Sequence, residues 1–172
     1  MSIRHSLLAL LAGQPAHGYG LKSSYEQNTG GTWPLNVGQV YSTLNRLERD
    51  GLVSAEGIDD SDRQTWRITP AGRKALAAWY ADPVVDDPAT RDELALKVLL
   101  AASAGASEAN GVIQSQRVAT LARLQQYTRL KRDADPATEL PFTLLIDALV
   151  LKAEAELKWL DRCEERLKRR KS

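Results

Sequence analysis

The chain has 172 residues, of which 43% are hydrophobic and 26% charged; this composition is typical of a globular protein and excludes disorder as the default. No apolar run approaches the roughly 18 residues that a membrane span needs. With Cys163 as its one cysteine and only His5 and His17 as histidines, the sequence offers no intrachain disulfide and no zinc-ligand set. We therefore expect a cytoplasmic protein without a metal or cofactor.

The charges are balanced, with a net charge of +1. Residues 1–82 hold eight Lys/Arg and eight Asp/Glu, and the remaining residues hold 15 and 14. A nucleic-acid-binding protein usually has a basic excess. If DNA is the partner, the positive charge must be segregated onto one surface.

The N-terminal half begins with two short helices. Apolar residues recur at helical spacing from Ile3 and stop at residues 13–15 (GQP), which end the first helix. A second helix is expected from near Gly18 to the glycines at 30–31. Residues 7–12 could also belong to a signal peptide, but the segment before them has one firm positive charge, which favours the amphipathic helix. We expect Trp33 and Trp66 to pack in the core of this half.

The third helix has the clearest pattern. Asn36 is expected to accept a hydrogen bond from the amide of Gln39, whose side chain reaches back in a capping box. Val40, Leu44 and Leu47 follow at i, i+4 and i+7 as one apolar stripe. Gly51 is placed for a left-handed cap after the helix.

A hairpin and a fourth helix are expected next. Residues 52–58 and 63–68 are the two strands, joined by the aspartate-rich turn at 59–62, and Trp66 and Ile68 share one face of the second strand. Thr69 caps the following helix, Pro70 occupies its first position, and the helix runs to about Tyr80.

The second half is predicted to be wholly helical. The acidic, proline-containing residues 82–88 are the expected boundary between domains 1–82 and 83–172. Helices are expected over 92–102, over 107–133 with Ser107 as a cap, and over 138–169, with a break at residues 135–136. The last of these has an apolar surface about 240° wide, which one neighbouring helix cannot cover. We expect a second copy of the chain to cover the rest, in a symmetric dimer whose interface these helices form.

The fold class predicted is mainly α, with an N-terminal winged helix-turn-helix whose wing is a small β-hairpin. In such a module the third helix lies in the major groove and the hairpin contacts phosphates. Gly38 allows close approach of the backbone, and the expected base-reading residues are Gln39, Ser42 and Thr43. The side chains expected to hold phosphates on this helix are Tyr41, Asn45, Arg46 and Arg49.

The wing is expected to contact DNA through Arg63, Thr65 and Arg67, on the strand face opposite Trp66. Asp59, Asp60 and Asp62 at its tip would be repelled by phosphates, so the tip should stay away from the duplex. A capped amphipathic helix is a common surface element, so the ordered set of elements supports DNA binding more than any residue does.

Three segments resemble the PadR family of transcriptional regulators: residues 17–21 (HGYGL), 38–53 (GQVYSTLNRLERDGLV) and 67–72 (RITPAG). The resemblance implies a DNA-reading third helix, and in residues from about 88 onward a helical dimerisation part, where the likeness is one of pattern. Trp66 stands where a tyrosine is more usual, and the wing lacks a basic tip. The family also implies a repressor on a palindromic operator, released by a small molecule or another signal.

The sequence supports an effector site only weakly. Trp79, Tyr80 and Trp159 are candidates to line an apolar cavity at the dimer interface, since aromatic rings stack on planar ligands. The simpler interpretation is that each fills a core or an interface. Cys163 has no resolving cysteine and is expected to be a buried apolar residue.

The two alternatives to DNA binding are a protein-binding winged helix and an enzyme. A winged helix can also dock another protein without a basic surface, and the balanced charge of residues 1–82 favours that alternative. An enzyme is not expected, because the sequence shows no phosphate-binding glycine loop, metal constellation or nucleophile–base pair.

Overall fold

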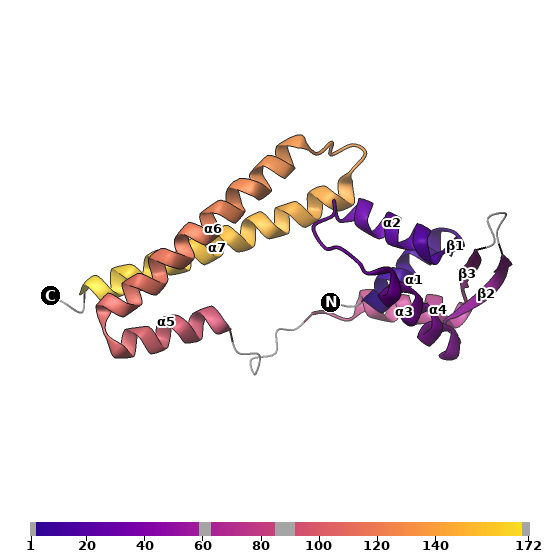
Figure 1. The fold of residues 1–172 in the computed structure, drawn as a ribbon, viewed down its shortest axis with the longest axis horizontal. Helices are drawn as coiled ribbons and strands as arrows, with labels where there is room; N and C mark the ends of the chain where they lie inside the picture. The colour runs from indigo at the N-terminus through magenta and orange to yellow at the C-terminus, as the bar shows by residue number, and fades with distance from the viewer. Residues whose placement is uncertain (1–2, 59–62, 85–91, 170–172) are drawn as a thin grey trace. The chain divides into compact units, whose positions relative to one another are not determined.

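The computed structural model describes residues 3–58, 63–84 and 92–169. The chain divides into two compact units, Met1–Val85 and Asp86–Ser172, which are coloured indigo to magenta and pink to yellow in Figure 1. Within the described residues, no helix is both long and apolar enough to cross a membrane.

The first unit is a winged helix-turn-helix, as predicted. Its elements in chain order are α1 (Ile3–Gly13), β1 (Ala16–His17), α2 (Gly18–Asn28), α3 (Val37–Arg49), β2 (Val53–Ile58), β3 (Gln64–Ile68) and α4 (Pro70–Ala81). The strands form an antiparallel sheet in the order β1-β3-β2. Strand β1 was not predicted, because two residues carry no periodicity; Ala16 pairs with Trp66 and His17 with Thr65. His17 also caps α2, its Nδ1 accepting from the Gly20 amide at 2.9 Å.

The core of this unit lies between α1 and α3. Leu7, Leu8 and Leu11 of α1 are buried against the predicted stripe of α3, and Trp66 and Ile68 of β3 close the cluster. Each fully buried leucine contributes about 2 kcal/mol by removal of apolar surface from water. The stripe is therefore confirmed, and the opposite face of α3 is left outside the core.

Of the two caps predicted for α3, the one at its C-terminal end is confirmed and the one at its N-terminal end differs in its hydrogen bond. Asn36 is its N-cap, but its Oδ1 accepts from the amide of Gly38 at 2.7 Å, so the predicted cap on Gln39 is wrong. An N-cap oxygen can reach either of these two amides. At the other end Gly51 has the predicted left-handed conformation, with φ 71°, and the Leu52 amide donates to the Leu47 carbonyl at 2.8 Å.

Thr69 joins the sheet, α3 and α4. Its amide donates to the Leu52 carbonyl at 3.0 Å, its hydroxyl donates to the Gly51 carbonyl at 2.7 Å, and the same oxygen accepts from the Gly72 amide at 3.1 Å. Pro70 stands in the first turn of α4, where a missing N–H costs no helical hydrogen bond. Both predicted roles are confirmed.

In the described part of the second unit, residues 92–169, there are three helices: α5 (Glu93–Ala104), α6 (Ala106–Asp133) and α7 (Leu140–Arg169). The long helices α6 and α7 run antiparallel side by side, and α5 packs against α6 (Figure 1). Asp92 caps α5, its carboxylate accepting from the Ala95 amide at 3.1 Å. The predicted cap at Ser107 is wrong: α6 begins one residue earlier, after Gly105, without a side-chain cap.

A polar cluster lies between α6 and α7. Thr120 is 0% exposed and its hydroxyl donates to the carboxylate of Glu156, which also accepts from Gln116 and Arg123 at 2.8 and 2.9 Å. Burial raises the pKa of Glu156, but the three hydrogen bonds and the charge of Arg123 outweigh it and hold the pKa below its ordinary value. A partly buried carboxylate that accepts from these partners favours one register of the helix pair.

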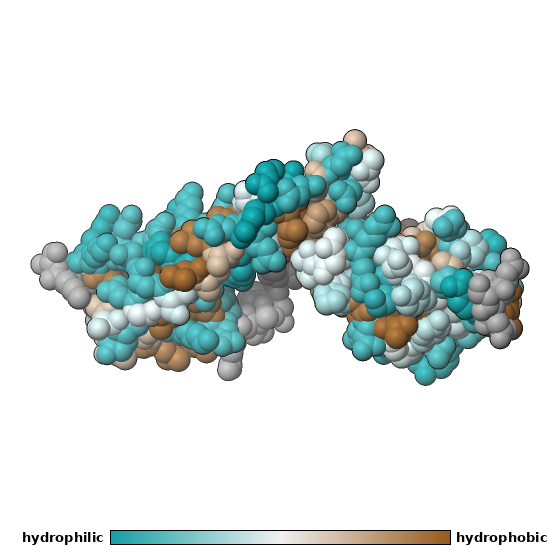
Figure 2. Space-filling model, turned by 45° about the horizontal axis from the view of Figure 1, so that its top comes forward, coloured by the Kyte–Doolittle hydropathy of each residue, from teal (hydrophilic) through white to brown (hydrophobic). Residues whose placement is uncertain are grey.

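An apolar line on α7 stays outside the core of this unit. Leu144 and Leu151 are 61% and 64% exposed, whereas Ile146 and Leu160 are buried. Leu99 and Leu100 of α5 are also exposed, and Figure 2 shows apolar side chains in brown among the hydrophilic ones on this unit. The helices therefore have more apolar surface than they bury against one another.

We predict that Gly72→Ala lowers the free energy of unfolding by about 2 kcal/mol or more. A Cβ at Gly72 would overlap the backbone carbonyl of Leu52 and lie 2.7 Å from Cγ1 of Ile68. Urea unfolding followed by circular dichroism measures the change. The control is Gly111→Ala in α6, where a Cβ meets nothing within 4 Å, and which should stabilise by about 0.5–1 kcal/mol. Equal effects of the two substitutions would contradict the close packing at Gly72.

Candidate nucleic-acid interface

The side of α3 opposite the apolar stripe is exposed and carries no acidic residue before Glu48. Its exposed members among the predicted contact residues are Gly38, Gln39, Tyr41, Ser42, Asn45, Arg46 and Arg49. Thr43 is the exception. It is only 6% exposed, because it lies beside Leu44 and one turn after Val40, on the edge of the stripe. Its prediction as a base-reading residue is wrong.

Ser42 and Arg46 lie one helical turn apart on this face. The Ser42 hydroxyl donates to the Gln39 carbonyl at 3.1 Å, and the Arg46 Nε donates to the Ser42 carbonyl at 3.4 Å. Within the part of the chain that the structure describes, Arg46 makes no ion pair with an acidic side chain. Its guanidinium is therefore available to bind an external anion.

Arg49 ends the face at the last turn of α3. It is 75% exposed, and its Nε lies 4.0 Å from Asp50, at the outer limit of an ion pair. Asp50 is held by Arg4 of α1, whose Nη1 lies 2.6 Å from the carboxylate. Because Arg4 already neutralises Asp50, the charge of Arg49 is only weakly compensated.

Tyr41 is positioned by a glycine on the neighbouring helix. A Cβ added at Gly18 would lie 2.7 Å from the Tyr41 ring, so the ring packs directly on the start of α2. This is the physical reason for glycine at position 18. The ring itself remains partly exposed, although its hydroxyl-bearing carbon, Cζ, is the ring atom nearest to Gly18.

The wing is less free to bind an anion than the sequence indicates. Arg67 is exposed as predicted, but it forms an ion pair with Glu56 of β2, and the hydrogen bond to Glu56 raises the pKa of Arg67 above its ordinary value. The Thr65 hydroxyl donates to the Gly57 carbonyl at 3.2 Å. Arg63 is exposed immediately before β3. Asp59, Asp60 and Asp62 lie outside the described residues.

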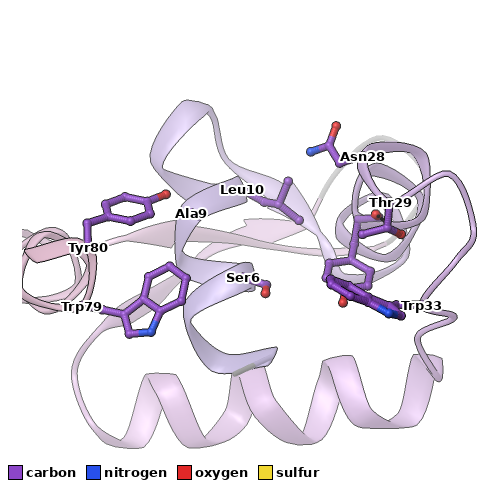
Figure 3. Close-up of a pocket in the computed structure, with 9 residues that line it drawn as sticks. Ser6, Ala9, Leu10, Asn28, Thr29, Trp33, Trp79 and Tyr80 are labelled. Carbon is purple, nitrogen blue, oxygen red and sulfur yellow. Dashed lines mark hydrogen bonds between the residues drawn. The ribbon is translucent and has the colours of Figure 1, made fainter. Parts of the chain in front are cut away.

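A pocket of about 480 Å³ opens on the first unit, away from the exposed side chains of α3. Trp79 and Tyr80 of α4 stand on one side of α1 and Trp33 stands on the other (Figure 3). Trp33 is 37% exposed, so the prediction that it packs in the core is wrong. Trp159, the third residue of the predicted effector set, belongs to α7 and packs against the core of the second unit.

Sequence reasoning missed Trp33 and Glu56 as members of these sites. Trp33 precedes a proline in a connector, and a large aromatic residue there is a signal for a surface pocket as much as for a core. Glu56 pairs with Arg67 only through the register of the hairpin, in which Ser54 lies opposite Arg67 and a bulge follows Ala55. The sequence pattern does not predict that bulge.

Two family models cover the two units of the chain. Residues 7–78 match the model described as "Transcriptional regulator PadR-like family". Residues 90–168 match the model described as "Virulence activator alpha C-term". The first model and the relatives below are described as transcriptional regulators, not as enzymes.

Among curated proteins, the chain is similar to the "Probable transcriptional regulator Rv1176c" of Mycobacterium tuberculosis, with 26% identity over 99% of this chain and 100% of that protein. The "Negative transcriptional regulator PadR" of Bacillus subtilis is 23% identical over 78% of each chain.

Two solved structures have the same fold along nearly the whole chain. Bacillus subtilis PadR in complex with operator DNA has a TM-score of 0.74 at 18% identity, covering 97% of this chain and 99% of that one. The Vibrio cholerae virulence activator AphA has a TM-score of 0.72 at 25% identity, covering 96% and 97%. With the winged helix and the exposed face of α3 in place, residues 7–78 belong to the PadR-like family of transcriptional regulators, and residues 90–168 match the virulence activator C-terminal model.

Proposed function

We propose that this regulator binds a palindromic operator as a homodimer, with α3 in the major groove and the wing on the phosphate backbone. The observation that carries the proposal is the outer face of α3, where polar side chains and two arginines lie opposite a fully buried stripe. Gln39 and Ser42, in the first turns, are the proposed base-reading residues. Tyr41, Asn45, Arg46 and Arg49 hold phosphates, and Gly38 admits the backbone closely. Arg63, Thr65 and Arg67 form the wing contact.

The homodimer is supported by the apolar line on α7. Leu144 and Leu151 cannot be covered by α6, which already packs on the buried side of α7. A two-fold symmetric pairing of this helix with its copy would bury the line on both chains at once. Two copies of α3 would then face two half-sites of one operator.

Repression and release by a small molecule are the finer part of the proposal. One relative is named a negative regulator, and one structure of the same fold is described as a complex with p-coumaric acid. The virulence activator among the similar structures is a reminder that this fold also serves activation. Acting on chromosomal DNA, the protein would work in the cytoplasm.

A protein-binding winged helix is the alternative, favoured by the equal numbers of acidic and basic residues in 1–82. The test is binding to DNA from the region upstream of the protein's own gene, by fluorescence anisotropy over a series of salt concentrations. DNA binding must weaken steeply with salt because phosphate contacts release counterions. Absence of any salt-dependent binding to specific or random duplex would favour the alternative.

Arg46→Ala should weaken binding to specific and random duplexes alike and reduce the slope of log affinity against log salt by about one, because one phosphate contact is lost. The matched control is Arg129→Ala on α6, since the Nε of Arg129 also donates to the carbonyl one turn earlier, at 3.4 Å. Anisotropy titrations measure both variants. An unchanged slope for Arg46→Ala would refute the assignment of the α3 face.

Glu56→Gln should tighten DNA binding and make the salt slope steeper by up to about one. The substitution releases Arg67 from its ion pair on the wing, so its charge becomes available to a phosphate. The control is Glu154→Gln, which removes the same charge from an exposed position on α7. If both variants bind DNA as the wild type does, Arg67 is not a phosphate contact.

Leu151→Glu should raise the dissociation constant of the dimer about tenfold or more, because a charge would be buried at the interface. Lys152→Glu places the same side chain at the adjacent, exposed position beside the apolar line and serves as the control. Sedimentation velocity over a concentration series measures both. Equal dissociation constants for the two variants would place the dimer interface elsewhere.

A further inference from the structure

The pocket on the first unit is a groove with a narrow floor and aromatic walls. Ser6, Ala9 and Leu10 of α1 form the floor, and in Figure 3 the rings of Trp79 and Trp33 stand on opposite sides of it. Small side chains at two floor positions leave the space between the walls open. A groove of about 480 Å³ lies within the range of small-molecule sites.

The wall formed by Trp79 and Tyr80 is supported by ring contacts. The ring of His5 stacks on Trp79, with centroids 4.9 Å apart and planes 3° from parallel. Burial, and then the charge of Arg4, lower the pKa of His5 below its ordinary value, so the ring behind Trp79 is neutral at pH 7. Trp79 also contacts Tyr80, with the two ring centroids 5.2 Å apart. These contacts fix the aromatic surface before a ligand arrives.

No ionised side chain lines the groove among the residues that the structure describes. The nearest pair on α2, Lys22 with Glu26 at 2.6 Å, is internally compensated, and Glu26 also accepts from the Leu35 amide. An anion or a cation entering this groove would lose its hydration without gaining a counter-charge. A flat uncharged ring system loses little hydration free energy and gains stacking area on an aromatic wall.

We propose that this groove is the effector site and that its ligand is an uncharged, planar aromatic molecule of about two fused rings. The inference rests on the proposed function, since it names the ligand class and the site of a regulator released by a small molecule. It places recognition on α1, α4 and the end of α2, within the winged-helix unit.

The experiment uses the full chain and three probes of the same size that differ in charge: methyl 2-naphthoate, 2-naphthoate and N-methylquinolinium. Isothermal titration calorimetry at pH 7.5 measures their affinities without DNA. We expect the neutral ester to bind at least about tenfold more tightly than either ion, the cost of an uncompensated charge. Equal affinities, or tighter binding of either ion, would overturn the assigned ligand class.

Two variants test the site. Trp33→Ala and Tyr80→Ala, both at partly exposed side chains, should each weaken binding of the ester about tenfold, with unchanged thermal unfolding. Tyr19→Ala removes an exposed aromatic side chain of α2 outside the groove and should bind the ester as the wild type does. If the groove variants alter dimerisation and leave ester binding unchanged, the groove is covered by protein and the proposal fails.

A last arm separates this inference from the proposed function. The ester should weaken binding of the wild type to its upstream DNA about tenfold and leave Trp33→Ala unaffected. Ester binding without any effect on DNA affinity would overturn the effector role. If the wild type shows no salt-dependent DNA binding, the proposed function fails, whereas the calorimetric comparison of the three probes still decides whether the groove takes a neutral aromatic ligand.

Discussion

The turn at Gly51 and Leu52 fixes α3 relative to the sheet and α4. Only a left-handed residue permits the Leu52 amide to reach back to Leu47, and the same turn presents two carbonyls to Thr69. Gly72 then packs against Leu52 so closely that no side chain fits. The direction in which the polar face of α3 points, and with it the distance of the wing from α3, therefore depends on a few backbone hydrogen bonds. The stability of this unit and the orientation of the polar face of α3 therefore share one cause.

The first unit has equal numbers of acidic and basic residues, so a basic surface can arise only where acidic side chains are paired with cations elsewhere. Asp50, Glu26 and Glu56 are each held by a nearby cation, and Arg46 is left without an acidic partner among the described residues. A field that attracts DNA depends on uncompensated charges, so two arginines on one helix can matter although the totals are equal. On the wing, by contrast, the charge of Arg67 is compensated by Glu56.

The sequence allowed prediction of every helix, because their apolar positions recur at a spacing that only a buried helical face explains. The caps at Thr69 and Gly51 were also predictable, since one residue type in one local conformation decides each. The failures have a common physical origin. Strand β1, the pocket position of Trp33 and the pair of Arg67 with Glu56 depend on which segments meet in space. The prediction for Thr43 failed for a smaller reason. Its position is at the edge of the apolar stripe, where the sequence pattern does not decide whether a side chain is buried or exposed.

Helix α1 links the two surfaces of the first unit. Leu7, Leu8 and Leu11 pack against the stripe of α3, and the neighbouring residues Ser6, Ala9 and Leu10 form the floor of the aromatic groove. Arg4, at the start of the same helix, holds Asp50 at the end of α3. Because a packed core resists compression, a ligand that displaces α1 must also displace α3 or open the core between them. A ligand bound in the groove would therefore reach α3 only through the core that α1 and α3 share.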